Sequence, residues 1–446
     1  MRIAVIGGGL GGLTAAHALL AAGIDAHVFE ASDHPGGVVG TSDVDGFVRE
    51  HAASSFLGGP PHGALALCNE LGVSVEKASA HAKHRFVYID GKLRAVPSSP
   101  FALVRSDLLT WRGKLDLLRE PLRPAAPAGA DESIHAFAAR RLGPEAARAL
   151  VAPFVTGIYA ADAHDISAAA GFPKLAELDA RGGIVRGMLK QMGRTLLAKV
   201  VRKTATAKTP RGLWAPAGGL GKLVDVLAHQ LGPAVRVNAR IAELASDTNG
   251  VRVDGERFDG AVLAIPAEDA APLVAIPELA NRLSGFHRAP AALVYLGYRD
   301  TDVPRARDGF GALVALNESP RVLGIVFEST VWTRRAPAGH ALLRCIFGGG
   351  RDPSACQLDD ATLIEHATRD AATIVGATGA PVHASVIRWK RGVAQYGLGH
   401  RDRVREAVTL ARTHKIVLAG ADYRGPGIND LCADADLVVD EVRAWS

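Results

Sequence analysis

The chain has 446 residues, of which 48% are hydrophobic and 22% are charged, and its formal net charge is +5. This composition is typical of a soluble globular protein, and the length suggests about two to three domains. No uninterrupted apolar stretch approaches the length of a membrane span, which argues against a transmembrane protein.

Residues 1–30 have the pattern of a complete nucleotide-binding unit. A strand at residues 2–6 leads into a glycine run from Gly7 to Gly12, a helix over residues 13–22 follows, and a second strand at 26–29 ends at Glu30. In the motif G-x-G-x-x-G, the glycines permit a tight turn, let the backbone approach a pyrophosphate, and let helix and strand pack closely. The helix start offers N–H groups to phosphates, and Glu30 is placed to bind a ribose diol. The sequence therefore predicts an α/β fold with a Rossmann-like domain.

Two further glycine-rich loops favour FAD over NAD. Gly36 and Gly37 come soon after Glu30, where an extended FAD needs the backbone to come close. Near the C-terminus, a buried strand at 415–420 ends in glycine, and a loop leads to a helix predicted over 428–443. The positive end of that helix can stabilise anionic reduced flavin. The residues expected from these motifs to bind FAD are Gly7, Gly9, Leu10, Gly11, Gly12, Glu30, Gly36, Gly37, Val38, Gly420, Ala421, Gly427, Ile428 and Asn429.

Because the two ends of the chain build one domain, the middle must be inserted into it. We expect a discontinuous FAD-binding domain at residues 1–75, 210–275 and 400–446. Within it we expect a helix at 221–231, a strand pair at 235–237 and 240–244, and a strand at 257–265. Residues 80–205 are expected to be mostly helical. Residues 276–399 are expected to be a mixed α+β domain with a helix at 360–375.

The positive charge is concentrated in one segment. No Asp or Glu occurs between Asp179 and Asp225, where many Lys and Arg occur. Residues 184–201 have the pattern of a basic amphipathic helix. Such a helix could bind an anionic membrane surface or attract an acidic substrate. The alternative is a helix whose charged face is simply solvated. Its apolar residues are Met188, Leu189, Met192, Leu196 and Leu197. The segment has no interleaved aromatic residues and no known module, so nucleic-acid binding is not expected.

Neither a metal site nor a catalytic triad is expected. The cysteines are scattered without metal-like spacing, and we expect buried free thiols in a reducing compartment. They are Cys68, Cys345, Cys356 and Cys432. The isolated His51, His84 and His400 are expected to be structural. Met1 leads directly into a strand and leaves no room for a signal peptide, so the expected location is the cytoplasm, with or without peripheral membrane contact.

Short blocks in a fixed order carry a specific resemblance. They are residues 83–93 with Val96-Pro97, 132–137 with Leu142-Gly143, 157–160, Phe172-Pro173, 218–220, 309–311, 323–327, Gln395-Tyr396 with Gly399-His400, and 418–420 with Asn429-Asp430. With these blocks the chain resembles, over essentially its whole length, the FAD-dependent protoporphyrinogen oxidases, a branch of the amine-oxidase-like flavoproteins. It is most similar to the bacterial oxygen-dependent type.

The resemblance implies a substrate-binding domain at 276–399 and a helical, membrane-associating and substrate-access domain at 80–205. It implies oxidation of protoporphyrinogen IX to protoporphyrin IX by removal of six electrons in heme biosynthesis, with O2 as acceptor and H2O2 as product. No protein residue is expected to be catalytic, because a methylene between two pyrroles is doubly activated and flavin carries the chemistry. The expected partner is the tetrapyrrole, and the expected assembly is a monomer or homodimer.

Individual positions also match the family. The resemblance implies that Arg85 binds a substrate propionate, which suits charge-assisted hydrogen bonding. Gly157 is expected near the substrate ring, with Phe310, Leu313 and Ile346 sandwiching the macrocycle. Implied FAD contacts outside the glycine motifs are Trp214 and the main chain of Ile241.

The chain departs from the family pattern at the substrate rim. Ala52 and Ala53 replace a common Gly-Pro, and the next position, often a polar or basic substrate contact, is Ser54. Gly183 and Ala394 stand where a serine and a proline are frequent. These departures leave three alternatives open. They are a coproporphyrinogen III oxidase that forms coproporphyrin III, a polyamine-type oxidase with Lys390 as the flavin-adjacent lysine, and a non-catalytic FAD- or tetrapyrrole-binding protein.

Overall fold

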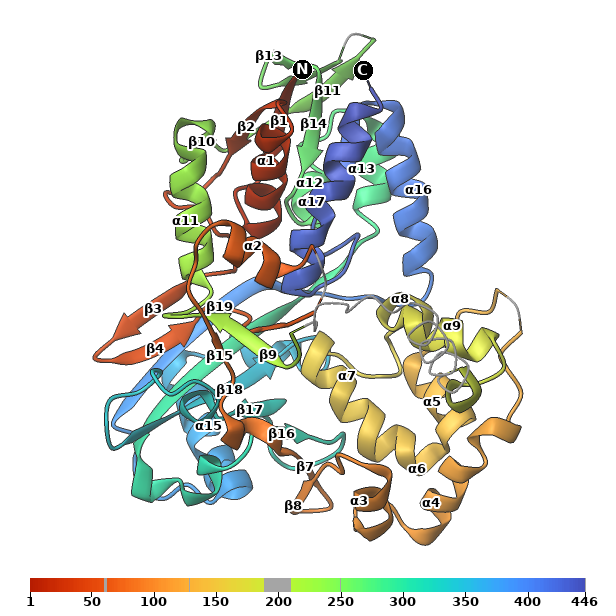
Figure 1. The fold of residues 1–446 in the computed structure, drawn as a ribbon, viewed down its shortest axis with the longest axis vertical. Coiled ribbons are helices and arrows are strands. Elements are labelled where there is room, and N and C mark those ends of the chain that lie inside the picture. The colour runs from red at the N-terminus through yellow and green to blue at the C-terminus, as the bar shows by residue number, and fades with distance from the viewer. Residues whose placement is uncertain (60–61, 128, 188–209, 249, 446) are drawn as a thin grey trace, which may run out of the picture.

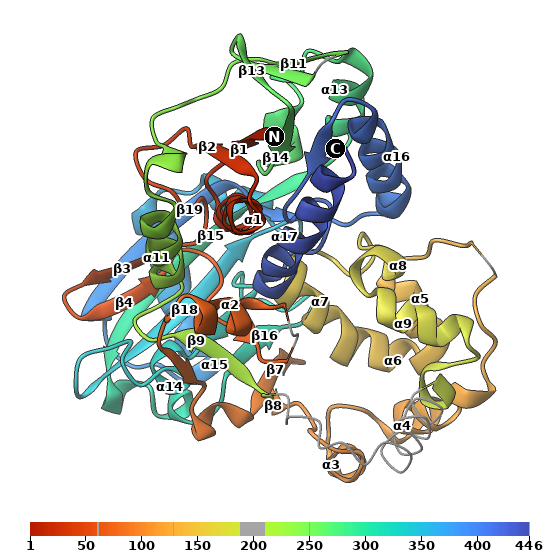
Figure 2. The ribbon, with the colours of Figure 1, turned by 45° about the horizontal axis from the view of Figure 1, so that its top comes forward.

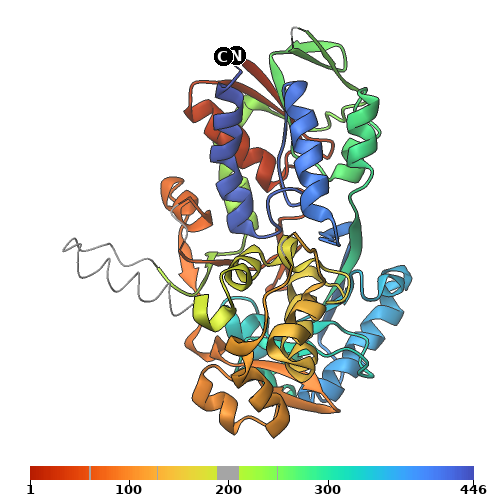
Figure 3. The same cartoon turned by 90° about the vertical axis from the view of Figure 1, so that its right-hand side faces the viewer.

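The computed structural model describes the chain except for residues 60–61, 128, 188–209, 249 and 446. A parallel sheet with its helices forms one end of the molecule, and both chain termini lie there side by side (Figures 1 and 3). A second, larger sheet and a group of helices form the other end (Figure 1).

The five strands of the parallel sheet come from both ends of the chain and from the middle. Their order is β10-β2-β1-β14-β20, and every neighbouring pair is parallel. Ile3 and Val5 of β1 face one apolar core, whereas Ala4 and Ile6 face another. A strand that is buried on both faces reads as a continuous apolar run, as this one does. The strands are β1 (Arg2–Ile6), β2 (Asp25–Phe29), β10 (Val235–Arg236), β14 (Gly260–Leu263) and β20 (Ile416–Leu418).

Helices cover both faces of this sheet. Figure 2 looks almost down α1 and shows it between α11 and α17, with which it shares one core. The opposite face is covered by α13 and α16. The Rossmann-like prediction is confirmed. The helices of this region are α1 (Leu10–Ala21), α2 (Ala64–Glu70), α11 (Gly221–Leu231), α12 (Ala267–Ala270), α13 (Pro277–Leu283), α16 (His400–Thr413) and α17 (Ile428–Arg443).

The strand pair predicted at 235–237 and 240–244 is wrong. Instead, β10 extends the parallel sheet beside β2, and β11 begins at the end of the second stretch and pairs with β12. The strand predicted at 257–265 is divided at Asp259, whose N–H donates to Arg2 O at 2.9 Å and whose carboxylate accepts from Arg2 N at 2.7 Å. These bonds turn the chain from a small antiparallel sheet into the parallel one. The small sheet contains β11 (Leu244–Asp247), β12 (Gly250–Val253) and β13 (Glu256–Phe258).

The second sheet has seven strands in the order β19-β15-β18-β17-β16-β7-β8. Helix α15 (Asp360–Val375), at the predicted position, packs on one face of it. The expectation that residues 80–205 are mostly helical is wrong for β7 and β8, which form a hairpin at this sheet's edge. A turn at Asp90-Gly91, both with positive φ, connects them, and Asp-Gly is a strong hairpin signal. The strands are β7 (Arg85–Ile89), β8 (Lys92–Ala95), β15 (Arg288–Arg299), β16 (Gly311–Val314), β17 (Gly324–Val326), β18 (His340–Gly348) and β19 (His383–Ala394).

The remaining helices lie beside this sheet (Figure 1). Arg141, with no exposed surface, pairs with Glu120 and Asp179 and joins three segments of the group. A Cβ on Gly183 would lie 2.1 Å from the Arg141 guanidinium, which explains the glycine there. The helices are α3 (Pro100–Arg105), α4 (Trp111–Leu118), α5 (Ile134–Leu142), α6 (Pro144–Ala146), α7 (Ala152–Tyr159), α8 (Ala168–Gly171) and α9 (Pro173–Ala180), with a π-helical turn at Ala147–Val151.

Of the predicted basic helix, residues 184–187 are helical, and the rest, with all five apolar residues named above, lies outside the described residues. Within the described part of the chain, no helix is long and apolar enough to span a bilayer.

Two short sheets complete the fold. The short sheets are the hairpin of β3 (Thr41–Val44) and β4 (Phe47–Glu50), and the sheet of β5 (Phe56–Leu57), β9 (Leu213–Pro216) and β6 (Val75–Lys77).

Candidate functional site: the glycine loops and a cavity beside them

The first glycine loop is shaped by backbone contacts. Gly7 has φ +106°, and a Cβ on Gly12 would lie only 1.9 Å from Gly7 O. Helix α1 begins with Gly9 as its N-cap and without a capping side chain. The N–H groups of its first turn have no intrahelical acceptor, so they can bind a phosphate.

The second glycine loop lies against the first. Gly36 N donates to Gly8 O at 2.7 Å, and a bridge joins Gly9 to Gly36. Gly36 and Gly37 both have positive φ. A Cβ on Gly9 would come no nearer than 4.0 Å to this second loop, so space remains beside its backbone.

Glu30 is held at the end of β2. Its Oε2 accepts from Gly8 N at 2.8 Å, and its Oε1 accepts from the N–H and hydroxyl of Ser32 at 2.8 and 2.6 Å. The carboxylate is therefore fixed beside the glycine loop. Ala239 N donates to Glu30 O, which brings the segment before Ile241 to the same edge.

The C-terminal loop lies on the other side of α1. A Cβ on Gly11 would be 3.8 Å from Gly420 Cα. Helix α17 begins at Ile428, and Asp430 accepts from Gly427 N at 3.0 Å. The Asn429 amide is engaged within the protein, because it donates to Leu57 O at 2.7 Å and accepts from Ala64 N at 2.9 Å.

A cavity of about 320 Å³ lies between α7, the larger sheet and the start of α17. Three of the residues predicted to bind the cofactor line this cavity. Three of the residues predicted to bind the substrate also line it. Gly157 and Leu313 touch across it, since a Cβ on the glycine would be 3.0 Å from the leucine side chain. The six residues are Val38, Ala421 and Ile428 for the cofactor, and Gly157, Leu313 and Ile346 for the substrate.

The other two predicted substrate residues form a pair next to this wall. The exposed Arg85 guanidinium lies 5.3 Å from the Phe310 ring centroid. Phe310 packs in the same apolar cluster as Ile346. Trp214 lies in β9, with the Lys77 ammonium 6.0 Å from its ring, and is not among the lining residues of the cavity. Its contact with FAD stays a prediction.

The cavity wall carries positive charge. Among the described residues that line it are Arg288 and Arg344, and no Asp or Glu. Each arginine pairs with a buried carboxylate that is itself off the lining: Arg288 with Asp422 at 2.8 Å and Arg344 with Glu328 at 2.9 Å. Sequence reasoning missed both arginines, although a charged residue in the apolar strand β18 is a signal of its own.

His51 and Trp389 also line the cavity and were not predicted to bind ligand. The Trp389 indole donates to His51 O at 2.7 Å, and burial lowers the pKa of the His51 imidazole. Lys390, considered above as a flavin-adjacent lysine, is exposed. It is not among the residues that line the cavity.

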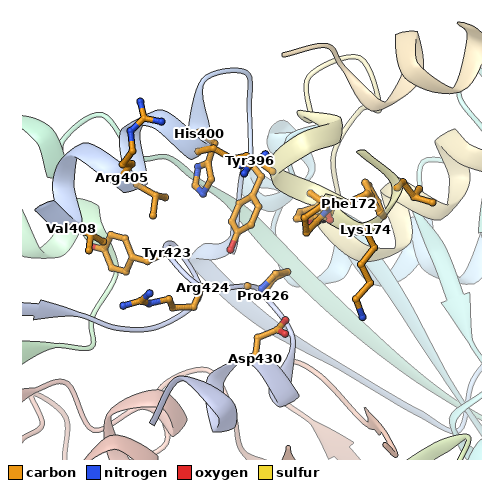
Figure 4. Close-up of a pocket in the computed structure, with 18 residues that line it drawn as sticks. Phe172, Lys174, Tyr396, His400, Arg405, Val408, Tyr423, Arg424, Pro426 and Asp430 are labelled. Carbon is orange, nitrogen blue, oxygen red and sulfur yellow. Dashed lines mark hydrogen bonds between the residues drawn. The ribbon is translucent and has the colours of Figure 1, made fainter. Parts of the chain in front are cut away.

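A second cavity, of about 610 Å³, backs onto the first. Figure 4 shows Tyr396 and His400 together on one side of it and Asp430 at the start of α17 on another. The Tyr396 and His400 rings stack with centroids 4.0 Å apart, and the Tyr396 hydroxyl donates to Ala421 O, in the wall of the first cavity. Burial and Arg403 lower the pKa of His400 to about 4, so its imidazole is neutral at pH 7 and serves packing.

Comparison with known proteins assigns the chain to a family. Residues 10–429 match the family described as flavin containing amine oxidoreductase. The chain belongs to this family. Within it, the chain belongs with the protoporphyrinogen oxidases. It is 30% identical to human protoporphyrinogen oxidase over 470 residues, which cover 96% of this chain and 95% of the human one. It is 26% identical to coproporphyrinogen III oxidase of Bacillus subtilis, with 97% and 96% covered.

Solved structures share the fold. A crystal structure from Exiguobacterium sp. 255-15, provisionally assigned as a protoporphyrinogen oxidase, superposes with a TM-score of 0.83 at 23% identity and covers 100% of this chain and 99% of that one. A redesigned putrescine oxidase superposes with a TM-score of 0.74 at 18% identity, with 100% and 99% covered. At these identities the likeness shows the fold alone.

This amine oxidoreductase family member is an FAD-dependent oxidoreductase, and its residues fit the cofactor. The crowded Gly7–Gly12 approach and the uncapped start of α1 would form a cradle for the pyrophosphate. Glu30 would supply fixed carboxylate oxygens for a ribose, and α17 begins at the cavity that would receive the flavin ring. The family departures at Ala52, Ala53 and Ala394 all line that cavity.

Proposed function

We propose that this protein oxidises protoporphyrinogen IX to protoporphyrin IX with O2 as acceptor and H2O2 as product. One observation carries the proposal: an apolar cavity with two arginines and no described acidic lining residue opens beside the start of α17, in the expected FAD site. The relatives' names supply the substrate class, because the human and spinach proteins, each 30% identical, are protoporphyrinogen oxidases.

The cavity suits a reaction that needs positioning more than acid–base chemistry. Bound FAD would supply the hydride acceptor and would pass the electrons on to O2. Each meso methylene is activated by its two flanking pyrroles. Three hydride removals would release three protons to solvent, two from pyrrole N–H groups and one from a meso carbon. Leu293, Leu313, Ile346 and Trp389 offer apolar surface that can hold the ring and exclude water.

The charge of the wall disfavours an amine substrate. A protonated amine would have to enter beside Arg288 and Arg344, with no lysine and no acidic side chain among the described lining residues. The nearby carboxylates of Asp422 and Glu328 are already paired with these arginines, so none is left to bind an ammonium group. A tetrapyrrole with propionates has the complementary charge.

Coproporphyrinogen III remains the second candidate. The two arginines in the cavity and Arg85 near it could pair with more than two carboxylates, and the Bacillus subtilis relative has this activity by name. Comparing turnover of the two porphyrinogens decides between them. Anaerobic mixing with each porphyrinogen tests catalysis itself, since bleaching of the flavin absorbance shows electron transfer and an unchanged spectrum would identify a non-catalytic binder.

We also propose reversible membrane binding, through a surface that the sequence did not single out. Trp111, Leu115 and Leu118 lie along one face of α4 and are 70%, 48% and 75% exposed. Phe101 of α3 and Leu122 just beyond α4 are 66% and 80% exposed. Figures 1 and 2 both show α3 and α4 together at the end of the molecule opposite the chain termini. Exposed apolar residues gathered on one surface mark an interaction site.

Vesicle sedimentation at low and high salt tests this binding. Changing both Trp111 and Leu118 to Ser should reduce partitioning on anionic vesicles by about tenfold or more, because each buried side chain contributes about 1.5–3 kcal/mol when fully transferred. Leu437→Ser, at a leucine of α17 that is 46% exposed, is the control and should change nothing. Wild-type protein that stays in the supernatant at low salt would disprove membrane binding.

A further inference from the structure

Arg344 occupies an unusual position on the cavity wall. It lies in β18, whose other residues from 341 to 348 are apolar, and its side chain is 7% exposed. Nevertheless it lines the cavity, two residues before Ile346 on the same face of the strand. Removing a guanidinium from water costs several kcal/mol even when it is paired, so this placement needs a reason beyond stability.

The contacts of Arg344 hold it from three sides. Nη1 donates to Ala52 O at 2.7 Å, Nη2 donates to the Ser54 hydroxyl at 3.1 Å, and Nε pairs with Glu328 Oε1 at 2.9 Å. Even with the hydroxyl of Tyr295, which the guanidinium also contacts, these partners take up fewer than its five N–H groups. One N–H group therefore remains, and a guanidinium held in this way can donate it to a carboxylate in a charge-assisted hydrogen bond.

A neighbouring pair shows what a purely structural arrangement looks like. Arg335 is 2% exposed, donates to Glu50 Oε1 at 2.6 Å, and does not line the cavity. Glu50 also accepts from Leu220 N at 3.1 Å. That pair joins segments far apart in the chain. Arg344 has a similar buried carboxylate behind it, but its own position is on the wall of the ligand cavity.

We propose that Arg344 binds a carboxylate of the substrate inside the cavity and so selects for porphyrinogens whose acid groups are free. This inference rests on the proposed function and extends it. Arg85 is exposed and lies at the edge of the site, so the two arginines would hold different acid groups of one macrocycle. Arg344 acts as a binding residue, and the electron transfer does not depend on it.

The test compares a free acid with its ester. Protoporphyrin IX and its dimethyl ester have nearly the same shape, but only the acid carries the charges that Arg344 would bind. Binding of each to the FAD-loaded protein is measured by porphyrin fluorescence. Because Arg344→Met alone would leave Glu328 buried and unpaired, the variant combines Arg344→Met with Glu328→Gln. Glu328→Gln alone is the matched control.

The double variant should bind the free acid about 10- to 100-fold more weakly, the range for a hydrogen-bonded charge, and the ester as wild type does. Glu328→Gln alone should bind the acid at least as tightly as wild type. Equal losses for acid and ester, or no loss for either, would overturn the role of Arg344. A shift in the flavin reduction potential without an acid-specific loss would overturn it too, by assigning the arginine to the cofactor.

Two further outcomes have a different meaning. If the wild-type protein binds neither porphyrin, the proposed function fails rather than the role of Arg344. If the double variant does not fold, judged by its FAD content and thermal unfolding, Arg344→Lys replaces it. That variant keeps the charge beside Glu328 but loses the planar fork, so acid binding should weaken by about 3- to 10-fold with the ester unchanged. No acid-specific loss in Arg344→Lys would equally overturn the inference.

Discussion

The two sides of the site are held in place by different kinds of contact. On the cofactor side, the loops before α1 and α17 are set by backbone geometry: positive φ at Gly7 and Gly420, and a carbonyl 1.9 Å from where a Cβ on Gly12 would lie. On the substrate side, the wall is made of side chains such as Leu313, Arg344 and Trp389, which come from separate strands of one sheet.

This difference explains how the two sides vary. Backbone geometry tolerates few residue types, so the cofactor loops keep their glycines and an acid at Glu30. A wall of side chains can be rebuilt one position at a time. Of the departures from the family pattern, Ala52, Ala53 and Ala394 are on that wall, whereas Gly183, expected at the substrate rim, lies against Arg141 among the helices.

The largest effect is expected from Gly12→Ala. The added methyl would meet the Gly7 carbonyl, which can move only if β1 and α1 separate. We expect a loss of at least about 3 kcal/mol in stability, at the upper end of overpacking effects, and protein that purifies without flavin. The ratio of flavin to protein absorbance and the thermal midpoint measure both.

Gly397→Ala is the control for this substitution. A Cβ there would have its nearest neighbour at 3.5 Å, an ordinary contact, and the glycine does not need a positive φ. This variant should retain FAD. Full flavin content in Gly12→Ala would show that the loop adjusts, and the contrast between a rigid cofactor side and an adaptable substrate side would not hold.

The next largest effect, on stability at low pH, is expected from His400 at the start of α16. This residue lies where the parallel-sheet end of the molecule meets α7, the helix that carries Tyr159. Its ring is buried against Tyr396, and Arg403, Asp422 and Asp131 are the charged groups around it. Since burial lowers its pKa from 6.5 to about 4, the unfolded chain takes up the proton first as the pH falls. Stability should therefore be lost between pH 6.5 and 4, by about 3 kcal/mol in total.

His400→Phe keeps a ring on Tyr396 and removes the titration. Denaturant unfolding at pH 7 and pH 4 should show the variant losing about 3 kcal/mol less than wild type on acidification. His287→Phe, which removes a histidine with a 75% exposed side chain, is the control for the loss of a histidine as such. Identical pH dependence of wild type and His400→Phe would contradict the buried neutral state.

Glu30→Ala should weaken FAD binding by about 1.5–3 kcal/mol, the range for hydrogen bonds to a charged group. The carboxylate already accepts from Gly8 and Ser32, so it is oriented before the cofactor arrives. Titration of apoprotein with FAD measures the change. Ser32→Ala removes one of the orienting bonds and should cost less. A larger loss for Ser32→Ala than for Glu30→Ala would mean that orientation matters more than the ribose contact.

Much of the fold could be predicted from sequence because its signals are local. The helices at 221–231, 360–375 and 428–443 have the predicted bounds, since each has a continuous apolar stripe and a clear end. The strand pair at 235–244 failed because a two-residue edge strand, Val235–Arg236, is recruited by β2 across a long separation. The β7–β8 hairpin was not predicted within the region expected to be mostly helical for the same reason, because β7 pairs with the distant β16.

The candidate site also has a part that could be predicted from local sequence and a part that could not. The glycine loops and Glu30 follow from a motif whose geometry is general. The substrate residues Gly157, Leu313 and Ile346 came from a family resemblance, and no spacing in the chain would have brought them together. Arg288 and Arg344 were missed because their meaning depends on burial and on which sheet face borders the cavity, which only the assembled sheet shows.

The smallest effect is expected from Arg85→Ala. The guanidinium is exposed above the Phe310 ring, so water screens its attraction for a carboxylate. We therefore expect its hydrogen bond to contribute about 0.5–1.5 kcal/mol to substrate binding. An anchor made equally in the bound and transition states raises KM and leaves kcat nearly unchanged. We therefore expect KM for the porphyrinogen to rise about 2- to 10-fold. Lys83→Ala, which removes a nearby exposed cation, is the control for long-range attraction and should change KM less. If Arg85→Ala instead lowers kcat with KM unchanged, Arg85 acts on the reacting geometry, and the edge of the site is as constrained as the cofactor loops.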